Sequence, residues 1–272
     1  MEAICRDFLP EHLAVEQEKI RFDGSIAVQA RMSLEETEWL LDLSKEYLGI
    51  KGVVGYVDLC SPEVGDQLDR FISNSKLVGV RHVVHDEPDD EFMARPEFLK
   101  GLEAVCERGL SYDLLLFPKH LPLAIKVVER FPNMRFVLDH IGKPKIKDGI
   151  VSPWKADLEK LAPYENVSCK LSGMVTETNW GQWHSRDFTP YLDVVLDAFG
   201  PRRLMIGSDW PVCEVAGSYE TVMGIVIEYV RGLSRDEEDH ILGLSCLEWY
   251  GIEVVSAPFS NGAGLSDPQS GR

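Results

Sequence analysis

Positive charge is scarce in this sequence. Its 272 residues contain 28 Lys and Arg against 45 Asp and Glu, which gives a formal net charge of −17. Binding to nucleic acid or to an anionic membrane surface depends on clustered basic side chains, and no Lys/Arg-rich segment offsets this balance. The sequence therefore predicts no nucleic-acid partner and no membrane partner, and it favours a small-molecule ligand.

Several other signatures are missing. No apolar run reaches the length of a membrane-spanning helix, about 18 residues, and the opening MEAICRDFLPEHL lacks the basic and apolar regions of a secretory signal. The 6 cysteines form no CxxC pair, which favours reduced thiols in a cytoplasmic protein. Neither GxGxxG nor GxxxxGK[ST] occurs, which argues against a nucleotide-binding open sheet.

What the sequence does contain is a regular alternation of short apolar runs and helix-like segments. Strands are predicted over 25–30, 52–59, 77–85, 112–117, 135–140, 167–173 and 204–210. A capping box, Ser33 with Glu36, opens one helical segment, and a second, Ser234 with Glu237, opens a final helix over 234–250. This alternation predicts an α/β fold whose parallel strands are buried on both faces, as in a TIM-type (β/α)₈ barrel.

The domain organisation follows from length and composition. Single barrels of about 250 residues are common, so residues 1–252 are predicted to form one barrel domain. Residues 253–272 are rich in Ser, Gly and Pro and are expected to be a disordered tail.

Polar residues interrupt five of the apolar runs at or just beyond their ends. They are Arg81, His82 and His85; Lys119 and His120; Asp139 and His140; Lys170 and Ser172; and Asp209. One such residue is readily explained as a satisfied polar group in the core, but five strand ends together are not. In a (β/α)₈ barrel the chemistry takes place at the carboxyl ends of the strands, so these side chains are the candidates for a site.

Four segments carry a resemblance to a known family. VLDHIGKP, CKLSG, RLMIGSDWPVC and DFLPEHL resemble amidohydrolase family 2, and within it the branch of L-fuconolactone and L-rhamnonolactone hydrolases. The similarity covers roughly residues 6–250. It implies a TIM-type barrel that hydrolyses small sugar lactones, with Asp209 as the aspartate that activates water and His140 as the histidine that faces the substrate or a metal.

The sequence departs from that family at its start. The family opens with a strand that ends in His-x-His, whereas none of the 7 histidines here forms such a motif, and His82 and His85 have the wrong spacing for one side of a strand. We interpret this as an incomplete barrel with strand one missing. A shortened form of the protein and a relative that evolved without metal both remain open as reasons.

The absent histidines also limit the metal that the resemblance implies. His140 and Asp209 alone are too few ligands for a tight tetrahedral site, so we expect either no cofactor or a weakly held divalent ion, zinc or manganese. Lactone hydrolysis also needs an electrophile at the carbonyl oxygen and groups that hold the ring. Cations could serve, and the candidates are Arg81, Lys119 and Lys143; His85 is a further substrate-binding candidate.

Tryptophans near two of the strand ends are candidates for sugar contact. Trp180 and Trp183 lie in the long segment TETNWGQWHSRD, and Trp210 directly follows Asp209. A tryptophan face offers apolar area to the CH groups of a sugar. Packing of a long loop explains these tryptophans equally well.

Two alternatives to a lactonase follow from the same residues. A non-catalytic barrel relative could bind a sugar acid without turnover, and a truncated barrel could be inactive. Homo-oligomerisation stays open as well, because the uncovered edge of a parallel sheet is a template for another strand. Sequence alone does not name the lactone, since hydroxyl recognition depends on loop geometry.

Overall fold

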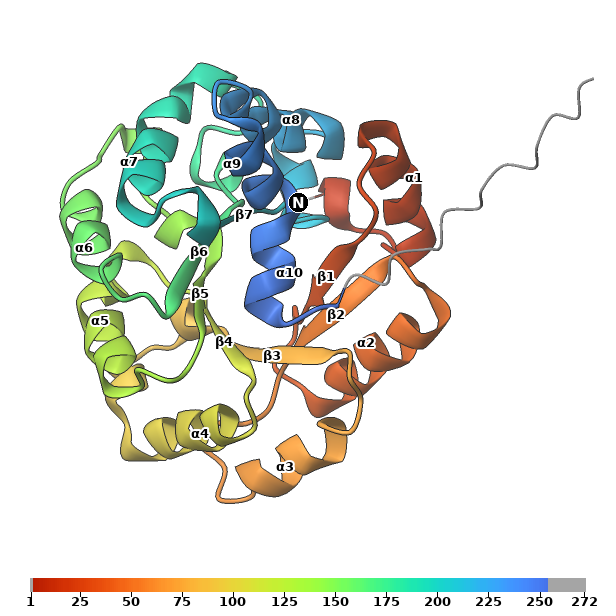
Figure 1. The fold of residues 1–272 in the computed structure, drawn as a ribbon, viewed down its shortest axis with the longest axis vertical. Coiled ribbons are helices and arrows are strands. Elements are labelled where there is room, and N and C mark those ends of the chain that lie inside the picture. Colours follow the sequence, from red (N-terminus) through yellow and green to blue (C-terminus); the bar gives the residue numbers. More distant parts are fainter. Residues whose placement is uncertain (1, 254–272) are drawn as a thin grey trace, which may run out of the picture.

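Seven parallel strands pair in sequence order in the computed structural model, which describes residues 2–253. The strands are β1 Ser25–Val28, β2 Ile50–Gly55, β3 Leu77–His82, β4 Ser111–Leu114, β5 Phe136–Leu138, β6 Val167–Leu171 and β7 Leu204–Ile206. The sheet curls and most of the helices lie on its outside (Figure 1). The predicted α/β class and the predicted order of strands are confirmed, although each of these strands ends earlier than the predicted run does.

The two edges of the sheet are β1 and β7. Each pairs with one neighbour only in the described part of the chain, β1 with β2 and β7 with β6. Between residue 2 and β1 the chain forms a 3₁₀ turn, Glu2–Ile4, and helix α1, Pro10–Ile20, and adds no strand to the sheet. The prediction of a TIM-type barrel that lacks one strand is therefore confirmed.

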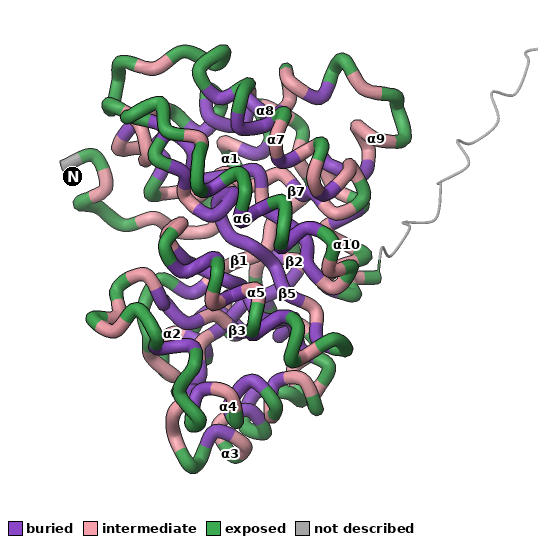
Figure 2. The backbone as a smooth tube through the Cα atoms, turned by 90° about the vertical axis from the view of Figure 1, so that its left-hand side faces the viewer, coloured by how far each residue is buried: buried purple, intermediate pink, exposed green. Residues whose placement is uncertain are grey.

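One helix follows each strand around the outside of the curl. These are α2 Leu34–Glu46, α3 Val64–Phe71, α4 Pro96–Glu107, α5 Leu121–Arg130, α6 Trp154–Leu161, α7 Thr189–Phe199 and α8 Tyr219–Val230. The hydroxyl of Ser33 accepts a hydrogen bond from the backbone N–H of Glu36 and so caps α2, as predicted. Figure 2 shows the buried backbone of the strands inside and the exposed turns of the helices outside.

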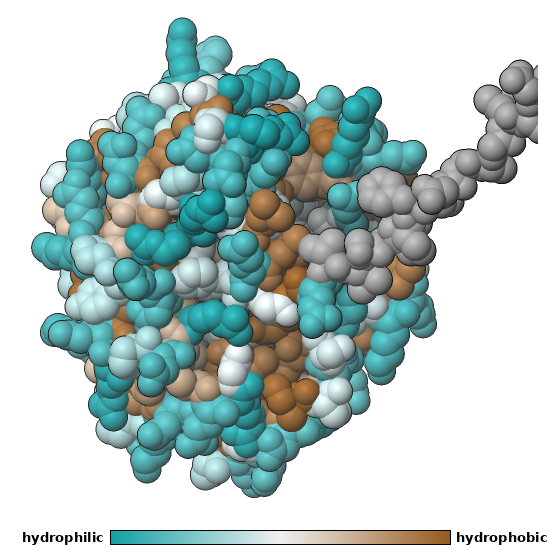
Figure 3. All heavy atoms as spheres, viewed as in Figure 1, coloured by the Kyte–Doolittle hydropathy of each residue, from teal (hydrophilic) through white to brown (hydrophobic). Residues whose placement is uncertain are grey.

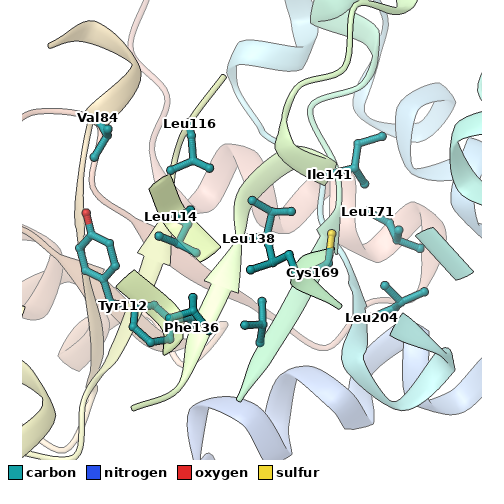
Figure 4. Packing of buried hydrophobic residues seen from close by; sticks show 14 of the residues in the cluster. Val84, Tyr112, Leu114, Leu116, Phe136, Leu138, Ile141, Cys169, Leu171 and Leu204 are labelled. Atoms are coloured by element: carbon teal, nitrogen blue, oxygen red, sulfur yellow. The ribbon is translucent and has the colours of Figure 1, made fainter. Parts of the chain in front are cut away.

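The main core lies between the sheet and these helices. Tyr112, Leu114, Phe136 and Leu138 come from adjacent strands and pack together there, fully buried (Figure 4). Since side chains alternate along a strand, their sequence neighbours Asp113 and Val137 point to the inside of the curl. The inside is where the polar strand ends can meet.

The C-terminal helical segment closes one side of the curl. It consists of α9, Arg235–Asp239, a π-helical turn, His240–Leu244, and α10, Ser245–Tyr250, so the helix predicted over 234–250 is present with a π-helical interruption. Tyr250 packs on inward-facing residues of four strands, Val54, Val78, Val137 and Met205. In Figure 1, α10 lies across the centre of the curl, and in the same view apolar side chains gather beside it (Figure 3).

Three other sequence predictions concern the tail, membrane-spanning helices and the cysteines. The tail predicted for 253–272 falls almost wholly on residues 254–272, which lie outside the described residues. Within the described residues, no helix is both long and apolar enough to cross a membrane. The 6 cysteines all lie within the described residues, and no disulfide joins any two of them there.

Candidate active site

His140 and Asp209 face each other at the carboxyl edge of the sheet. Nε2 of His140 lies 3.6 Å from Oδ1 of Asp209, and both side chains are largely buried. On its other side, Nδ1 of His140 lies 2.8 Å from the hydroxyl oxygen of Ser172. The imidazole is therefore held between a hydroxyl and a carboxylate, an arrangement that fixes its orientation. Burial lowers the pKa of His140. The negative charge of Asp209 acts in the opposite direction and offsets only part of this shift.

The backbone that delivers these side chains is left-handed. His140, Ile141 and Lys143 have φ of 54°, 49° and 50°, and Asp209 has φ of 57°. Non-glycine residues adopt this region at an energetic cost, and such residues cluster at functional sites. The indole of Trp154 donates a hydrogen bond of 2.7 Å to the carbonyl of Ile141 and so supports the turn. This sharp turn after β5 brings His140 and Lys143 to the same edge of the sheet.

Gly173 lies directly against the ring of His140. It has φ of +61°, and a Cβ built there would come within 2.5 Å of the His140 ring. A side chain at this position would therefore meet both a backbone penalty and a steric clash. Gly149 has a similar φ of +63° but nothing within 4 Å of such a Cβ, which makes it a matched control.

We expect Gly173→Ala to lower the free energy of unfolding by more than Gly149→Ala does. The left-handed backbone alone costs alanine about 1–2 kcal/mol, and only the first substitution adds a displaced His140. Denaturant titration of both variants measures the difference. Equal destabilisation would mean that His140 moves aside freely and that Gly173 does not fix it.

Three further predicted residues lie near His140. The charges of Lys143 and Arg81 both act on the pKa of His140 and on that of His85. The ring of His85 stacks on that of Phe117, with 4.8 Å between the ring centroids. Nζ of Lys143 lies 5.9 Å from the centroid of the Phe117 ring. Burial lowers the pKa of His85 to about 4, so it is neutral at pH 7. The structure thus brings Arg81, His85 and Lys143 into one group with His140 and Asp209.

Lys143 forms an ion pair with Glu177, which was not among the residues predicted from the sequence. Its Nζ lies 2.7 Å from Oε1 of Glu177, and the two side chains are 13% and 22% exposed. Glu177 belongs to the turn Val175–Glu177 that follows β6, and this turn contacts the turn Val212–Val215 that follows Asp209. We refer to Arg81, His85, His140, Lys143, Ser172, Glu177 and Asp209 as the carboxyl-end cluster.

Beneath the cluster, an ion network fills the inside of the curl. Nζ of Lys170 lies 2.5 Å from Asp113 and 2.7 Å from Asp139, and Nη1 of Arg81 lies 2.7 Å from the other oxygen of Asp139. The hydroxyl of Tyr250 donates a 2.8 Å hydrogen bond to Asp113. Nη2 of Arg81 donates to the backbone carbonyl of Gln29. The network therefore holds the guanidinium of Arg81 on two sides.

Burial and charge act in opposite directions on the acids of this network. For Asp139, burial would raise the pKa, but the charges of Lys170 and Arg81 outweigh it and the pKa is lowered. For Asp113, burial dominates and raises the pKa despite Lys170. For Lys170, burial would lower the pKa, but the two carboxylates raise it. The ammonium of Lys170 is thus the charge that the two acids share.

The remaining predicted residues have other contacts. Lys119 pairs at the surface with Asp90, at 2.5 Å. The indole of Trp183 donates to the carbonyl of Ala216, and its ring packs on Phe188. Trp180 is 47% exposed and donates to the carbonyl of Thr176.

Trp210, which follows Asp209, is held through its indole and its ring. Its indole donates to Glu214 at 2.8 Å, and Phe8 packs edge-on against its ring at 5.1 Å. Arg6 lies over Phe8 and pairs with the same Glu214. Residues before α1 thereby contact the loop that carries Asp209.

Comparison with known proteins places the chain in a family. A family model described as amidohydrolase matches residues 3–252. The chain belongs to the amidohydrolase family. An L-fucono-1,5-lactonase from Burkholderia multivorans is 36% identical over 263 residues, which cover 93% of this chain and 88% of that protein. An L-rhamnono-gamma-lactonase from Scheffersomyces stipitis is 27% identical and covers 62% of this chain and 54% of that protein.

A solved structure gives the same picture for the fold. An amidohydrolase from Burkholderia multivorans, crystallised with bound zinc, superposes with a TM-score of 0.90 at 37% identity, covering 93% of this chain and 92% of that one. The resemblance that the sequence motifs indicated is therefore confirmed, and so is the amidohydrolase barrel.

The described residues of this amidohydrolase offer few ligands to a metal. Between residues 2 and 253, no group of three or more His, Cys, Asp or Glu side chains is arranged to hold an ion. His140 and Asp209 provide two donors, whereas catalytic zinc sites commonly use three protein ligands. The described residues therefore do not fit a tightly bound zinc ion, in contrast to the zinc-bound relative.

Proposed function

We propose that this amidohydrolase hydrolyses small sugar lactones similar to L-fuconolactone or L-rhamnonolactone. The observation that carries the proposal is the pairing of His140 with Asp209 at the carboxyl edge of the barrel, in a chain that is 36% identical to an L-fucono-1,5-lactonase over most of its length. A carboxylate beside an oriented imidazole can act as a general base that activates water.

In the proposed reaction Asp209 acts as the general base. It takes a proton from water while the water oxygen attacks the lactone carbonyl carbon. The bond between the carbonyl carbon and the ring oxygen then breaks, and the proton held by Asp209 passes to that oxygen, which leaves a hydroxy acid. Ser172 and Asp209 orient His140, so that its ring faces the reacting water.

Arg81 is the proposed electrophile at the carbonyl oxygen. Asp139 and Gln29 engage both of its Nη atoms and so fix the guanidinium, while 11% of the side chain remains exposed. A preorganised cationic donor stabilises the charge that develops on the carbonyl oxygen of the tetrahedral intermediate. His85 and Lys143 are proposed to hold the substrate, and Trp210, next to Asp209, to cover it. Lys119, Trp180 and Trp183 remain weaker candidates because their contacts lie elsewhere.

A lactone panel tests the function and the metal together. Steady-state rates on L-fucono-1,5-lactone and L-rhamnonolactone are measured for the protein as purified, for the protein after treatment with EDTA, and for the protein with added zinc or manganese. We expect hydrolysis whose rate changes by less than about 3-fold in all conditions, because two ligands hold a divalent ion weakly at most. Loss of activity with EDTA that zinc restores would contradict the weak metal site. No turnover of any lactone would favour a non-catalytic relative that binds a sugar acid.

Other proposals accompany this function. Residues 1–252 are proposed to act as one barrel domain, and a cytoplasmic location is proposed for the protein. Homo-oligomerisation stays open, because among residues 2–253 no strand pairs with the outer edge of β1 or of β7.

A further inference from the structure

The cations in and beneath the carboxyl-end cluster are all paired with carboxylates. The pairs are Arg81 with Asp139 at 2.7 Å, Lys143 with Glu177 at 2.7 Å, and Lys170 with Asp113 at 2.5 Å and Asp139 at 2.7 Å. With Asp209 included, these groups are three cations and four acids. The net charge of these seven groups is −1, or zero when Asp113 is protonated. In neither case do these groups carry a net positive charge that would favour an anionic substrate.

The Lys143–Glu177 pair presents a donor and an acceptor side by side. The ammonium and the carboxylate oxygen are 2.7 Å apart and both remain partly accessible, a separation comparable to that of hydroxyl oxygens on adjacent ring carbons. One hydroxyl can donate to Glu177 while its neighbour accepts from Lys143. Hydrogen bonds to charged groups are stronger than those between neutral groups, so such a pair discriminates well between hydroxylated and bare rings.

The position of the pair suits recognition of the ring. The charge of Lys143 acts on both His140 and His85, which places its ammonium near the proposed reacting groups. Phe117 lies beside it and offers an apolar ring face. The left-handed backbone that begins at His140 and extends to Lys143 turns the chain at the end of β5. The reacting imidazole and the recognition pair are therefore built by one short segment.

We propose that the Lys143–Glu177 pair selects neutral lactones that carry adjacent hydroxyl groups and disfavours lactones that bear an additional carboxylate. This inference rests on the proposed lactone hydrolysis and adds a substrate class to it. The same charge balance affects the product. Ring opening creates a carboxylate in a group of residues without net positive charge, and repulsion from Glu177 and Asp209 promotes its release.

Three lactones separate the components of this proposal. L-fucono-1,5-lactone has a neutral hydroxylated ring, δ-valerolactone has a bare ring, and D-glucaro-1,4-lactone carries a carboxylate. The kcat/KM of each is measured for the parent, for Glu177→Gln and for Glu38→Gln. Glu38 pairs with Arg70 at 2.7 Å on the exposed outer surface, so Glu38→Gln is a matched control.

We expect Glu177→Gln to lower kcat/KM for L-fucono-1,5-lactone by about 10- to 100-fold, the value of a hydrogen bond to a charged group. The value for δ-valerolactone should stay within about 2-fold, since that ring has no hydroxyl to lose. The value for D-glucaro-1,4-lactone should rise, because Lys143 is then unpaired. Glu38→Gln should resemble the parent with all three substrates. A gain with one substrate is a result that structural damage does not produce.

Each other outcome overturns the inference. Equal losses on all three lactones would mean that Glu177 has a structural role, and an unchanged profile would mean that the pair does not touch substrate. A parent that prefers D-glucaro-1,4-lactone would contradict the charge argument. If the parent hydrolyses none of the three, the proposed function fails, and freshly prepared L-fucono-1,5-lactone then serves as a ligand for calorimetry that the protein does not turn over. Affinity that is equal in parent and Glu177→Gln, or absent in the parent, would overturn the recognition role.

Discussion

Asp209→Asn is expected to reduce kcat for lactone hydrolysis by about 10²- to 10⁴-fold, the usual contribution of a general base. Asparagine has the size of aspartate and can still contact His140, but it cannot accept the proton of the attacking water. It also tolerates the left-handed region that Asp209 occupies, at φ of 57°, better than other non-glycine residues do. The loss should therefore fall on turnover while KM changes by less than about 3-fold.

The control for this substitution is Asp42→Asn. Asp42 pairs with Lys45 on the exposed face of α2, at 2.7 Å, so the same chemical change there should leave kcat unaltered. Circular dichroism and thermal unfolding of both variants establish that each is folded. An Asp209→Asn variant as fast as the parent would remove Asp209 from the mechanism.

The sequence predicted the fold well because the fold depends on patterns that are local. Each buried strand appears as a short apolar run, and hydroxyl caps such as Ser33 stop the helices from extending backwards. The ends of the strands were predicted less well. β5 ends at Leu138, whereas the run RFVLDH continues through His140, because the backbone turns left-handed at His140 and leaves the sheet. No propensity scale anticipates that turn.

Only part of the candidate site was predicted, because some of its residues interrupt apolar runs whereas others are brought to the site only by the fold. His140, Asp209 and Arg81 interrupt apolar runs, which is a visible signal. Glu177 lies in an irregular segment among other polar residues, and only the fold brings it to Lys143. For Asp113, the run YDLLLF gave a signal, since it contains one acid in an apolar strand. Its partner Tyr250 is 137 residues away, so their hydrogen bond depends on the path of the whole chain.

The charges inside the curl bear on the stability of the fold as well as on the position of Arg81. Two acids and two cations share a space that the adjoining layer fills with Val54, Val137 and Tyr250. Moving such ions out of water is costly, and the cost is offset only while the pairs and hydrogen bonds are complete. The position of Arg81 depends on this network, since Asp139 holds one of its two Nη atoms and is itself held by Lys170.

Lys170→Met is accordingly expected to lower the free energy of unfolding by about 3–5 kcal/mol at pH 7, the range for removing one partner of a buried ion pair. Methionine keeps the length of the side chain but leaves Asp113 and Asp139 facing each other. Lys45→Met, which breaks an exposed pair, should cost less than about 1 kcal/mol. Denaturant titration measures both values.

The pH dependence of the Lys170→Met effect provides the decisive test. In the parent the pKa of Asp139 is lowered, so its contribution to stability is present above the unfolded pKa, near 3.9, and is lost as the pH falls through the folded value. In Lys170→Met the missing cation raises the folded pKa of the two acids, and a proton taken up on acidification relieves their repulsion. The difference in unfolding free energy between parent and variant should therefore shrink as the pH falls from 7 towards 4. A difference that stays constant over this range would show that the loss comes from packing and that Lys170 carries no charge-pairing role.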